Sequence, residues 1–281
     1  MREHPLPGED NQLEEIEISL LLEGLFRHYG VDFRDYAPAS LKRRIRESVR
    51  DEGLENVSAL QARILHNPAC LERLLRKFSI NVTAMFRDPE FYLAFRVKVV
   101  PLLKTYPFVR IWHAGCSTGE EVYSMAILLH EEGLYPRCRI YATDINKEVL
   151  KRAKEGIYSL ASMQEYTVNY MRAGGKHFFS DYYTAQYDHV MFNSALKSNL
   201  IFSEHNLVTD GSFNEFHVIM CRNVMIYFNK TLQARVHDLI YESLSMFGVL
   251  GLGNKESLRF TTREASYDEL DRANRLYRKV R

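Results

Sequence analysis

The stretch RIWHAGCSTGEE, residues 110–121, decides the fold of this chain. An apolar run leads into a loop with glycines four residues apart, Gly115 and Gly119, and a helical pattern follows. Glycine lets a ligand approach the backbone closely, and the first turn of a helix offers free N–H groups. A glycine pattern this loose indicates a ligand site only weakly, because a structural turn explains it as well.

A second apolar run, RIYATD at residues 139–144, ends in an acid that strengthens this interpretation. In open parallel sheets ligands bind outside the carboxyl ends of the strands, where an acid after the second strand can accept both hydroxyls of a ribose. Asp144 could also cap the following helix, and the two roles are compatible. We therefore predict a site for an adenosine-containing ligand that uses Gly115 and Asp144.

The charge at the start of the helix bears on the identity of this ligand. The loop lacks the third glycine of the dinucleotide fingerprint, and Glu120 and Glu121 stand where a pyrophosphate would bind. Two carboxylates there repel a pyrophosphate, whereas a sulfonium cofactor with an amino group tolerates them. The loop thus favours S-adenosylmethionine, although the glycine and acid pair alone does not separate it from a dinucleotide.

Working outward from these stretches, short apolar runs alternate with helical patterns beyond residue 108. This alternation predicts an α/β fold with a doubly wound, parallel sheet covered on both faces. Strands are expected at 109–114, 139–143, 200–203, 216–220, 249–253 and 275–280. Residues 165–200, rich in tyrosine, fit the rhythm poorly. We expect an inserted subdomain there, with a long surface loop as the alternative.

The first 80 residues carry apolar side chains at helical spacing and no strand pattern. Helices are expected from residue 13, from 38–41 to a stop at Gly53, from a cap at Ser58 to 65, from 68 to 78, and from a cap at Asp88 to about 103. The predicted organisation is a helical domain at 1–80, a linker at 81–90 and an α/β domain at 91–281.

Composition excludes several classes of protein. The 281 residues are 46% hydrophobic and 26% charged with a net charge of +1, which is ordinary for a globular protein and predicts no nucleic-acid partner. No apolar run approaches the roughly 20 residues that span a bilayer, and residues 1–12 lack the apolar core of a secretion signal. The four cysteines show no metal-type spacing. We expect a cytoplasmic, metal-free protein, with a monomer as the default.

Two further stretches make the prediction specific: NVTAMFRD at residues 81–88 and MCRNVMIYF at residues 220–228. Together with CSTGEE at 116–121 and ATDI at 142–145, they resemble the CheR family of chemoreceptor glutamate methyltransferases. The resemblance implies an S-adenosylmethionine-dependent methyltransferase domain with a Rossmann-like doubly wound sheet. It also implies a small antiparallel β insertion in that domain and an all-helical N-terminal domain.

The resemblance implies a set of cofactor-binding residues as well. The family's positions fall here on Asn81, Thr83, Arg87, Glu121, Asp144, Asn206, Leu207, Asn223 and Val224, to which the glycine loop adds Gly115. Asn81 and Thr83 could instead be turn and cap residues, and Arg87 could be a surface residue at a helix entry.

The implied reaction moves a methyl group from a sulfonium to a glutamate carboxylate, with S-adenosylhomocysteine as the second product. A glutamate with a pKa of about 4.3 is already ionised at neutral pH, so neither a base nor a metal is required. The enzyme has to hold the reacting atoms in line. Arg87 is the candidate for orienting charge, and Tyr227 is the candidate for lining the methyl path, with plain packing as its equal alternative. Arg222 could equally be a structural ion-pair partner.

A basic helix suggests how a partner is recognised. Residues 42–50 hold five positive side chains and one acid, a local charge of +4. A solvated helix face explains this charge simply, but in the family the helix is implicated in contact with glutamate-rich, helical receptors. The resemblance therefore implies partner-binding roles for Arg43, Arg44, Arg46 and Arg50. Some family members also bind a receptor tail peptide at the insertion by strand addition, and the sequence does not decide whether this one does.

Three other functions fit less well. A small-molecule methyltransferase leaves the motifs at 81–88 and 220–228 and the basic helix unexplained. A dinucleotide oxidoreductase is disfavoured by the glycine pattern and the acidic helix start. A non-catalytic module that senses the cofactor is compatible with the motifs, so a turnover assay is needed to separate it from the enzyme.

Overall fold

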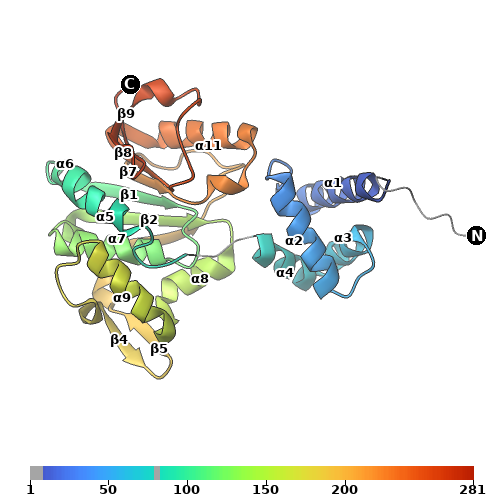
Figure 1. The fold of residues 1–281 in the computed structure, drawn as a ribbon, viewed down its shortest axis with the longest axis horizontal. Helices are drawn as coiled ribbons and strands as arrows, with labels where there is room; N and C mark the ends of the chain where they lie inside the picture. Colours follow the sequence, from blue (N-terminus) through green and yellow to red (C-terminus); the bar gives the residue numbers. More distant parts are fainter. Residues whose placement is uncertain (1–8, 79–82) are drawn as a thin grey trace, which may run out of the picture. The chain divides into compact units, whose positions relative to one another are not determined.

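The computed structural model describes residues 9–78 and 83–281 of the chain (Figure 1). The chain divides into two compact units. One, the helical unit, comprises residues 1–80 and 227–232, and the other, the α/β unit, comprises residues 81–226 and 233–281.

Residues 9–78 of the helical unit form four helices, as the spacing of apolar residues predicts. They are α1 (Glu9–Tyr29), α2 (Pro38–Asp51), α3 (Val57–His66) and α4 (Pro68–Phe78). Leu25, Ile45 and Leu60 lie in their shared core. The cap of α3 differs from the prediction, because the Asn56 side chain accepts the N–H of Ala59 at 2.9 Å. The Ser58 hydroxyl donates instead to Glu17 on α1, at 2.6 Å.

A segment from the far end of the sequence joins this unit. Tyr36 and Phe228 form an isolated antiparallel bridge, and their rings meet edge to face at 5.0 Å. The Asn229 N–H donates to the carbonyl of Asp35 at 2.8 Å. The last residues of the second family-like motif therefore pack with the helical unit.

The α/β unit is built on a seven-stranded sheet with the order β6-β2-β1-β7-β8-β10-β9 (Figure 1). The strands are β1 (Val109–Ala114), β2 (Cys138–Asp144), β6 (Leu200–Glu204), β7 (Phe216–Cys221), β8 (Leu244–Leu252), β9 (Tyr267–Asp271) and β10 (Leu276–Lys279). The first five run parallel, and β10 is antiparallel to β8 and β9. The predicted doubly wound α/β fold is confirmed, with one unpredicted edge strand, β9.

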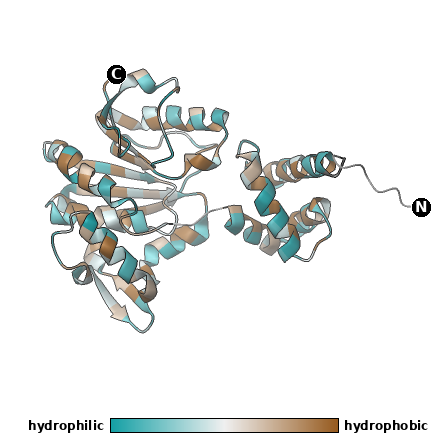
Figure 2. Cartoon of the chain, viewed as in Figure 1, coloured by the Kyte–Doolittle hydropathy of each residue, from teal (hydrophilic) through white to brown (hydrophobic). Residues whose placement is uncertain are grey.

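Helices follow the strands of this sheet. They are α7 (Glu120–Glu131) after β1, α8 (Lys147–Glu155) after β2 and α11 (Lys230–Ser243) after β7. By the hydropathy colouring of Figure 2, strand β7 is mostly hydrophobic, as expected for a strand covered on both faces, whereas α2 carries many hydrophilic residues.

The helix predicted from Asp88 to about residue 103 is interrupted. It consists of α5 (Pro89–Ala94), a π-helical turn (Phe95–Val99) and α6 (Val100–Leu103). Pro101 explains the interruption, because proline lacks an N–H and its ring clashes with the carbonyl four residues earlier. Asp88 precedes α5 with φ +57° and makes no capping bond with its side chain, so the predicted aspartate cap is wrong.

The inserted element is a three-stranded antiparallel sheet with the order β3-β5-β4, accompanied by α9 (Met163–Arg172). Its strands are β3 (Ile157–Ser159), β4 (Tyr183–Gln186) and β5 (His189–Phe192). The first strand begins before residue 165, directly after Gly156 ends α8. Phe192 stacks on Tyr123 of α7 at 5.1 Å, which joins the small sheet to the core of the α/β unit.

Candidate active site

The glycine loop lies at the carboxyl end of β1 and bends back onto β2. The N–H groups of Gly115 and Cys116 both donate to the carbonyl of Thr143 at 2.8 Å. Gly115 has φ +74°, and a Cβ there would lie 2.6 Å from a methyl group of Val224. Glycine is therefore required at this position by its conformation and by the approach of a second loop.

Asp144 ends β2 beneath this loop. Its carboxylate accepts the N–H of Ser117 at 2.9 Å and that of Asn146 at 3.0 Å, and the residue stays partly exposed. Burial raises the pKa of Asp144 above its usual value, against the effect of these hydrogen bonds. Asn146 supplies the cap of α8, since its side chain accepts the N–H of Glu148 at 2.9 Å. Asp144 therefore does not cap α8, and its carboxylate can still accept hydrogen bonds from a ligand.

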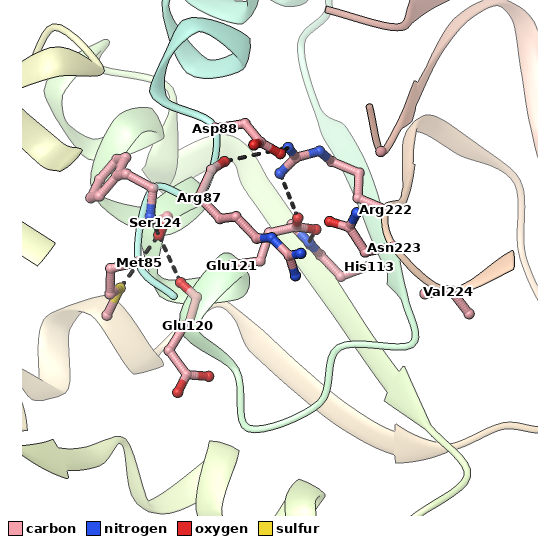
Figure 3. Close-up of polar contacts among 12 residues, drawn as sticks. Met85, Arg87, Asp88, His113, Glu120, Glu121, Ser124, Arg222, Asn223 and Val224 are labelled. Carbon is pink, nitrogen blue, oxygen red and sulfur yellow. Dashed lines mark hydrogen bonds and ion pairs between the residues drawn. The ribbon is translucent and has the colours of Figure 1, made fainter. Parts of the chain in front are cut away.

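Arg222, at the end of β7, connects three segments that are far apart in sequence (Figure 3). Its guanidinium, 0% exposed, pairs with Asp88 at 2.8 Å and with Glu121 of α7 at 2.9 Å. It also donates to the carbonyl of Arg87 at 3.3 Å and lies over the Phe91 ring. The arginine therefore has the structural ion-pair role that the sequence left open.

Glu121 is held by two partners in this network. One carboxylate oxygen lies 2.9 Å from Nδ1 of His113, and the other lies 2.9 Å from Arg222. Burial alone would raise the pKa of Glu121, but the hydrogen bond with His113 and the charge of Arg222 hold the pKa below its usual value. The predicted contact of Glu121 with the cofactor would have to be made by a carboxylate that already serves this network.

The first family-like motif is only partly described by the structure. Asn81 lies outside the described residues, and Thr83 is half-buried. The side chain of Arg87 extends between Glu121 and Asn223 in the view of Figure 3, while its backbone carbonyl is held by Arg222. Cofactor contact by Thr83 and Arg87 stays a prediction.

The turn after β7 is organised by an acid that belongs to none of the sequence motifs. The Glu256 carboxylate accepts the N–H groups of Asn223, Val224 and Met225 at 2.8, 2.9 and 2.8 Å. It also accepts the N–H of Gly253 at 2.7 Å. Asn223 is thereby fixed with φ +61°.

Glu256 itself is only 5% exposed, and burial raises its pKa despite the four hydrogen bonds. In the sequence it is one acid in the polar loop NKES, so no local pattern distinguishes it from a surface residue. The sequence signal for this role is weak: a glutamate that stands three residues after Gly253, the glycine that follows the buried strand β8.

The remaining cofactor candidates follow β6. The Asn206 side chain accepts the N–H of Val208 at 2.9 Å, and its own N–H donates to Asp210 at 2.8 Å. Leu207 is 8% exposed. Asn206 therefore has a turn-forming role in the structure, and cofactor contact by this pair stays a prediction.

Tyr227, the predicted lining of the methyl path, belongs to the helical unit. Its carbonyl accepts the N–H of Ala37 at 2.8 Å. Its ring lies under the guanidinium of Arg44, 5.2 Å from the ring centroid. These contacts match the packing alternative, and a role in catalysis stays a prediction.

The basic helix α2 exposes fewer unpaired positive charges than its sequence predicts. Arg44 is 3% exposed and donates to the carbonyl of Phe78, contacts that match a structural role, and its partner-binding role stays a prediction. The charge of Arg46 is paired with Glu14 of α1 at 2.5 Å, and Lys42 lies 2.9 Å from the same acid. Arg43 and Arg50 remain exposed. The helix therefore offers a smaller free positive charge than its sequence suggests.

Comparison with known proteins identifies the family of the chain. Residues 81–272 match the family described as CheR methyltransferase, SAM binding domain, and residues 16–79 match the CheR methyltransferase, all-alpha domain. The chain belongs to the CheR methyltransferase family. Its sequence is 51% identical to Cher3 of Pseudomonas putida, named as a methyltransferase, over 94% of this chain and 97% of that protein. It is 32% identical to the chemotaxis protein methyltransferase of Salmonella typhimurium, over 83% of this chain and 79% of that protein.

The CheR assignment makes the chain an S-adenosylmethionine-dependent methyltransferase. The site fits this cofactor, because the partly exposed Asp144 carboxylate suits a ribose and no phosphate has to be placed beside Glu120 and Glu121. Within residues 9–78 and 83–281, no group of three potential metal ligands is present. No helix in the same residues is long and apolar enough to cross a membrane.

Proposed function

We propose that the protein transfers methyl groups from S-adenosylmethionine to glutamate side chains of chemoreceptors and so forms glutamate methyl esters. The observation that carries this proposal is the state of the titratable groups at the carboxyl edge of β1 and β7. His113 is 1% exposed and bonded to Glu121, and burial raises the pKa values of Cys116 and Cys221. The thiols are therefore held in the protonated form, and the His113 ring is buried away from a substrate, so neither offers a base, and a carboxylate acceptor needs none.

The chemistry places simple demands on the chain. Bound S-adenosylmethionine supplies a methyl group on a positively charged sulfur, and transfer forms a carbon–oxygen bond while the carbon–sulfur electron pair returns to sulfur. In this proposal Asp144 binds the ribose hydroxyls, and the turn at Asn223 and Val224 contacts the cofactor from the other side. Arg87 orients the incoming carboxylate. The residues accelerate a direct displacement by holding the reacting groups in position and by stabilising charge.

Two kinds of support point to a receptor as the acceptor. The Salmonella typhimurium relative is named a chemotaxis protein methyltransferase, and that name concerns a protein 32% identical to this chain. The exposed Arg43 and Arg50 on α2 suit an acidic helical surface, which they would attract before contact. In the proposal Glu14 competes with the receptor for Lys42 and Arg46.

The test is a methyl-transfer assay with radiolabelled S-adenosylmethionine and the cytoplasmic fragments of chemoreceptors from the same organism. Glutamate methyl esters are hydrolysed by base, so the expected product releases volatile labelled methanol at high pH. A fragment with its acceptor glutamates replaced by alanine is the matched control. Cofactor binding without base-labile transfer to any fragment would contradict the proposal and favour a cofactor-sensing module.

A further inference from the structure

The loop that follows β8 combines a fixed base with an exposed tip. It spans residues 254–264 and is called here the β8–β9 loop. At its start Glu256 is bonded to the turn at Asn223–Met225, and Leu258 is 2% exposed. At its end Arg263 pairs with Asp238 of α11 at 2.6 Å. Both ends are therefore anchored to the α/β unit, and the first anchor is part of the candidate active site.

Phe260 stands at the tip of this loop and is 98% exposed. Its backbone has φ +64°, which is a genuine outlier for a bulky side chain. The conformation is held by local bonds, because its N–H donates to the Glu264 carboxylate at 2.8 Å and Thr261 bonds twice to the carbonyl of Leu258. An unfavourable backbone conformation that presents an aromatic ring to solvent is a feature of binding loops.

Two positive side chains precede this ring on the same loop. Lys255 and Arg259 are exposed, and within the described part of the chain neither has an acidic partner within 4 Å. This differs from Lys42 and Arg46 of α2, which are already paired with Glu14. The loop thus carries an exposed aromatic ring and two exposed cations, while Glu264 at the tip is engaged by the Phe260 N–H, and this combination suits an acidic helix with an apolar groove.

We propose that the β8–β9 loop is a contact element for the protein substrate. Phe260 enters an apolar groove of the glutamate-bearing helical segment, and Lys255 and Arg259 pair with acids on that segment. This inference rests on the proposed function and adds to it a recognition surface on the α/β unit. The exposed part of the loop, which makes the proposed contact, is separate from Glu256, which is bonded to the turn that contains Asn223 and Val224.

The experiment compares the full-length protein with two variants, Phe260→Ala and the double substitution Lys255→Glu with Arg259→Glu. The KM for a chemoreceptor cytoplasmic fragment and the Kd for S-adenosylhomocysteine are measured for each. Matched controls are Phe108→Ala, an exposed phenylalanine just before β1, and Lys151→Glu, an exposed lysine on α8. Because Phe260 is fully exposed, its truncation leaves the core intact.

The inference is supported if Phe260→Ala raises the KM for the receptor fragment about tenfold and the double charge reversal raises it further, most strongly at low salt. The Kd for S-adenosylhomocysteine should stay within twofold in both variants. An unchanged KM in both variants would overturn the inference and leave glutamate methylation standing. A raised Kd would overturn it as well, because the loop would then act through the cofactor site. If the unaltered protein neither binds nor methylates any receptor fragment, the proposed function fails and this inference fails with it.

Discussion

Two carboxylates of the candidate active site, Asp144 and Glu256, each accept backbone N–H groups and differ in the acceptor capacity that they leave for a ligand. Asp144, the last residue of β2, accepts backbone N–H groups from Ser117 and Asn146 and stays partly exposed. Glu256, after β8, accepts four backbone N–H groups and is 5% exposed. A carboxylate has roughly four acceptor sites, so Glu256 is saturated and Asp144 is not.

The difference separates two tasks that one residue type can perform. Glu256 gives its whole acceptor capacity to the backbone and so fixes the turn at Asn223 and Val224. Asp144 gives part of its capacity to the glycine loop and retains the rest for a ligand. Substitution of the first should therefore disturb the shape of the site, and substitution of the second should disturb ligand binding.

The largest effect is expected for Asp144→Ala. Two hydrogen bonds from ribose hydroxyls to a charged group contribute about 1.5–3 kcal/mol each, which corresponds to a loss of affinity on the order of 100-fold or more. Calorimetric titration with S-adenosylhomocysteine measures this loss. Asp268→Ala, at an exposed aspartate on β9, is the matched control. Unchanged affinity in Asp144→Ala would remove the distinction between the two acids.

The next effect is expected for Glu256→Ala, which leaves four buried N–H groups without their acceptor. An unsatisfied buried donor costs about 1–3 kcal/mol, and partial hydration should limit the total to roughly 3 kcal/mol, or about 5–10 °C in Tm. We expect kcat to fall about tenfold or more, because the turn at Asn223 loses its support.

Glu256→Gln tests whether Glu256 acts by position. Glutamine keeps one oxygen, which accepts the two N–H groups on one side, so Tm and kcat should both recover in part. Calorimetric melting and methylation kinetics of the two variants decide this. A Glu256→Gln variant as inactive as Glu256→Ala but fully stable would show that the charge of Glu256 acts on the reaction directly.

The same comparison shows what the sequence could reveal. Asp144 could be predicted because it ends an apolar strand beside a glycine loop, and that local order is visible in residues 110–144. Glu256 could not, because its partners at 223–225 are some 30 residues away and its importance comes from burial, which no local pattern encodes. The strands β1 and β7 were predictable as apolar runs, whereas the polar edge strand β9, YDELD, was not.

The basic helix gives a second example of the same limit. The spacing of Leu41, Ile45 and Val49 correctly predicts α2, and Arg44 falls on the same buried face of that helix. Arg44 lies one position before Ile45 and is buried with it, donating to Phe78. The pairing of Arg46 with Glu14 joins residues 32 apart, so it depends on how α1 packs against α2.

A third prediction joins the two halves of the site. Gly115→Ala places a methyl group 2.6 Å from a Val224 methyl, at a residue with φ +74°. We expect about a tenfold loss of affinity for S-adenosylhomocysteine. Val224→Ala removes the colliding methyl, so the double variant should regain most of the loss, leaving the cost of the positive φ. Strictly additive losses in this double-mutant cycle would show that the two loops do not share one binding surface.

The smallest effect concerns pH and separates the two acids without changing their shape. Burial raises the pKa of both Asp144 and Glu256. Ribose hydroxyls bond more strongly to an ionised carboxylate than to a protonated one, so affinity for S-adenosylhomocysteine should decline as the pH falls through the raised pKa of Asp144, at a higher pH than for an ordinary aspartate. Titrations between pH 5 and 7.5, with folding checked by circular dichroism, measure the decline. The slope should vanish in Asp144→Ala and persist in Glu256→Gln.

The effect on folding stability has the opposite sign. A carboxyl group whose pKa is higher in the folded state than in the unfolded state contributes stability below its unfolded pKa, and that stability is lost as the pH rises through the folded pKa. Ionised Asp144 therefore costs folding free energy at neutral pH, the condition in which it can bind a ribose. Lowering the pH should therefore weaken the binding of S-adenosylhomocysteine while it relieves the cost of ionised Asp144 to folding. If the affinity and the free energy of unfolding instead fall together, carboxylates other than Asp144 dominate the pH dependence of stability.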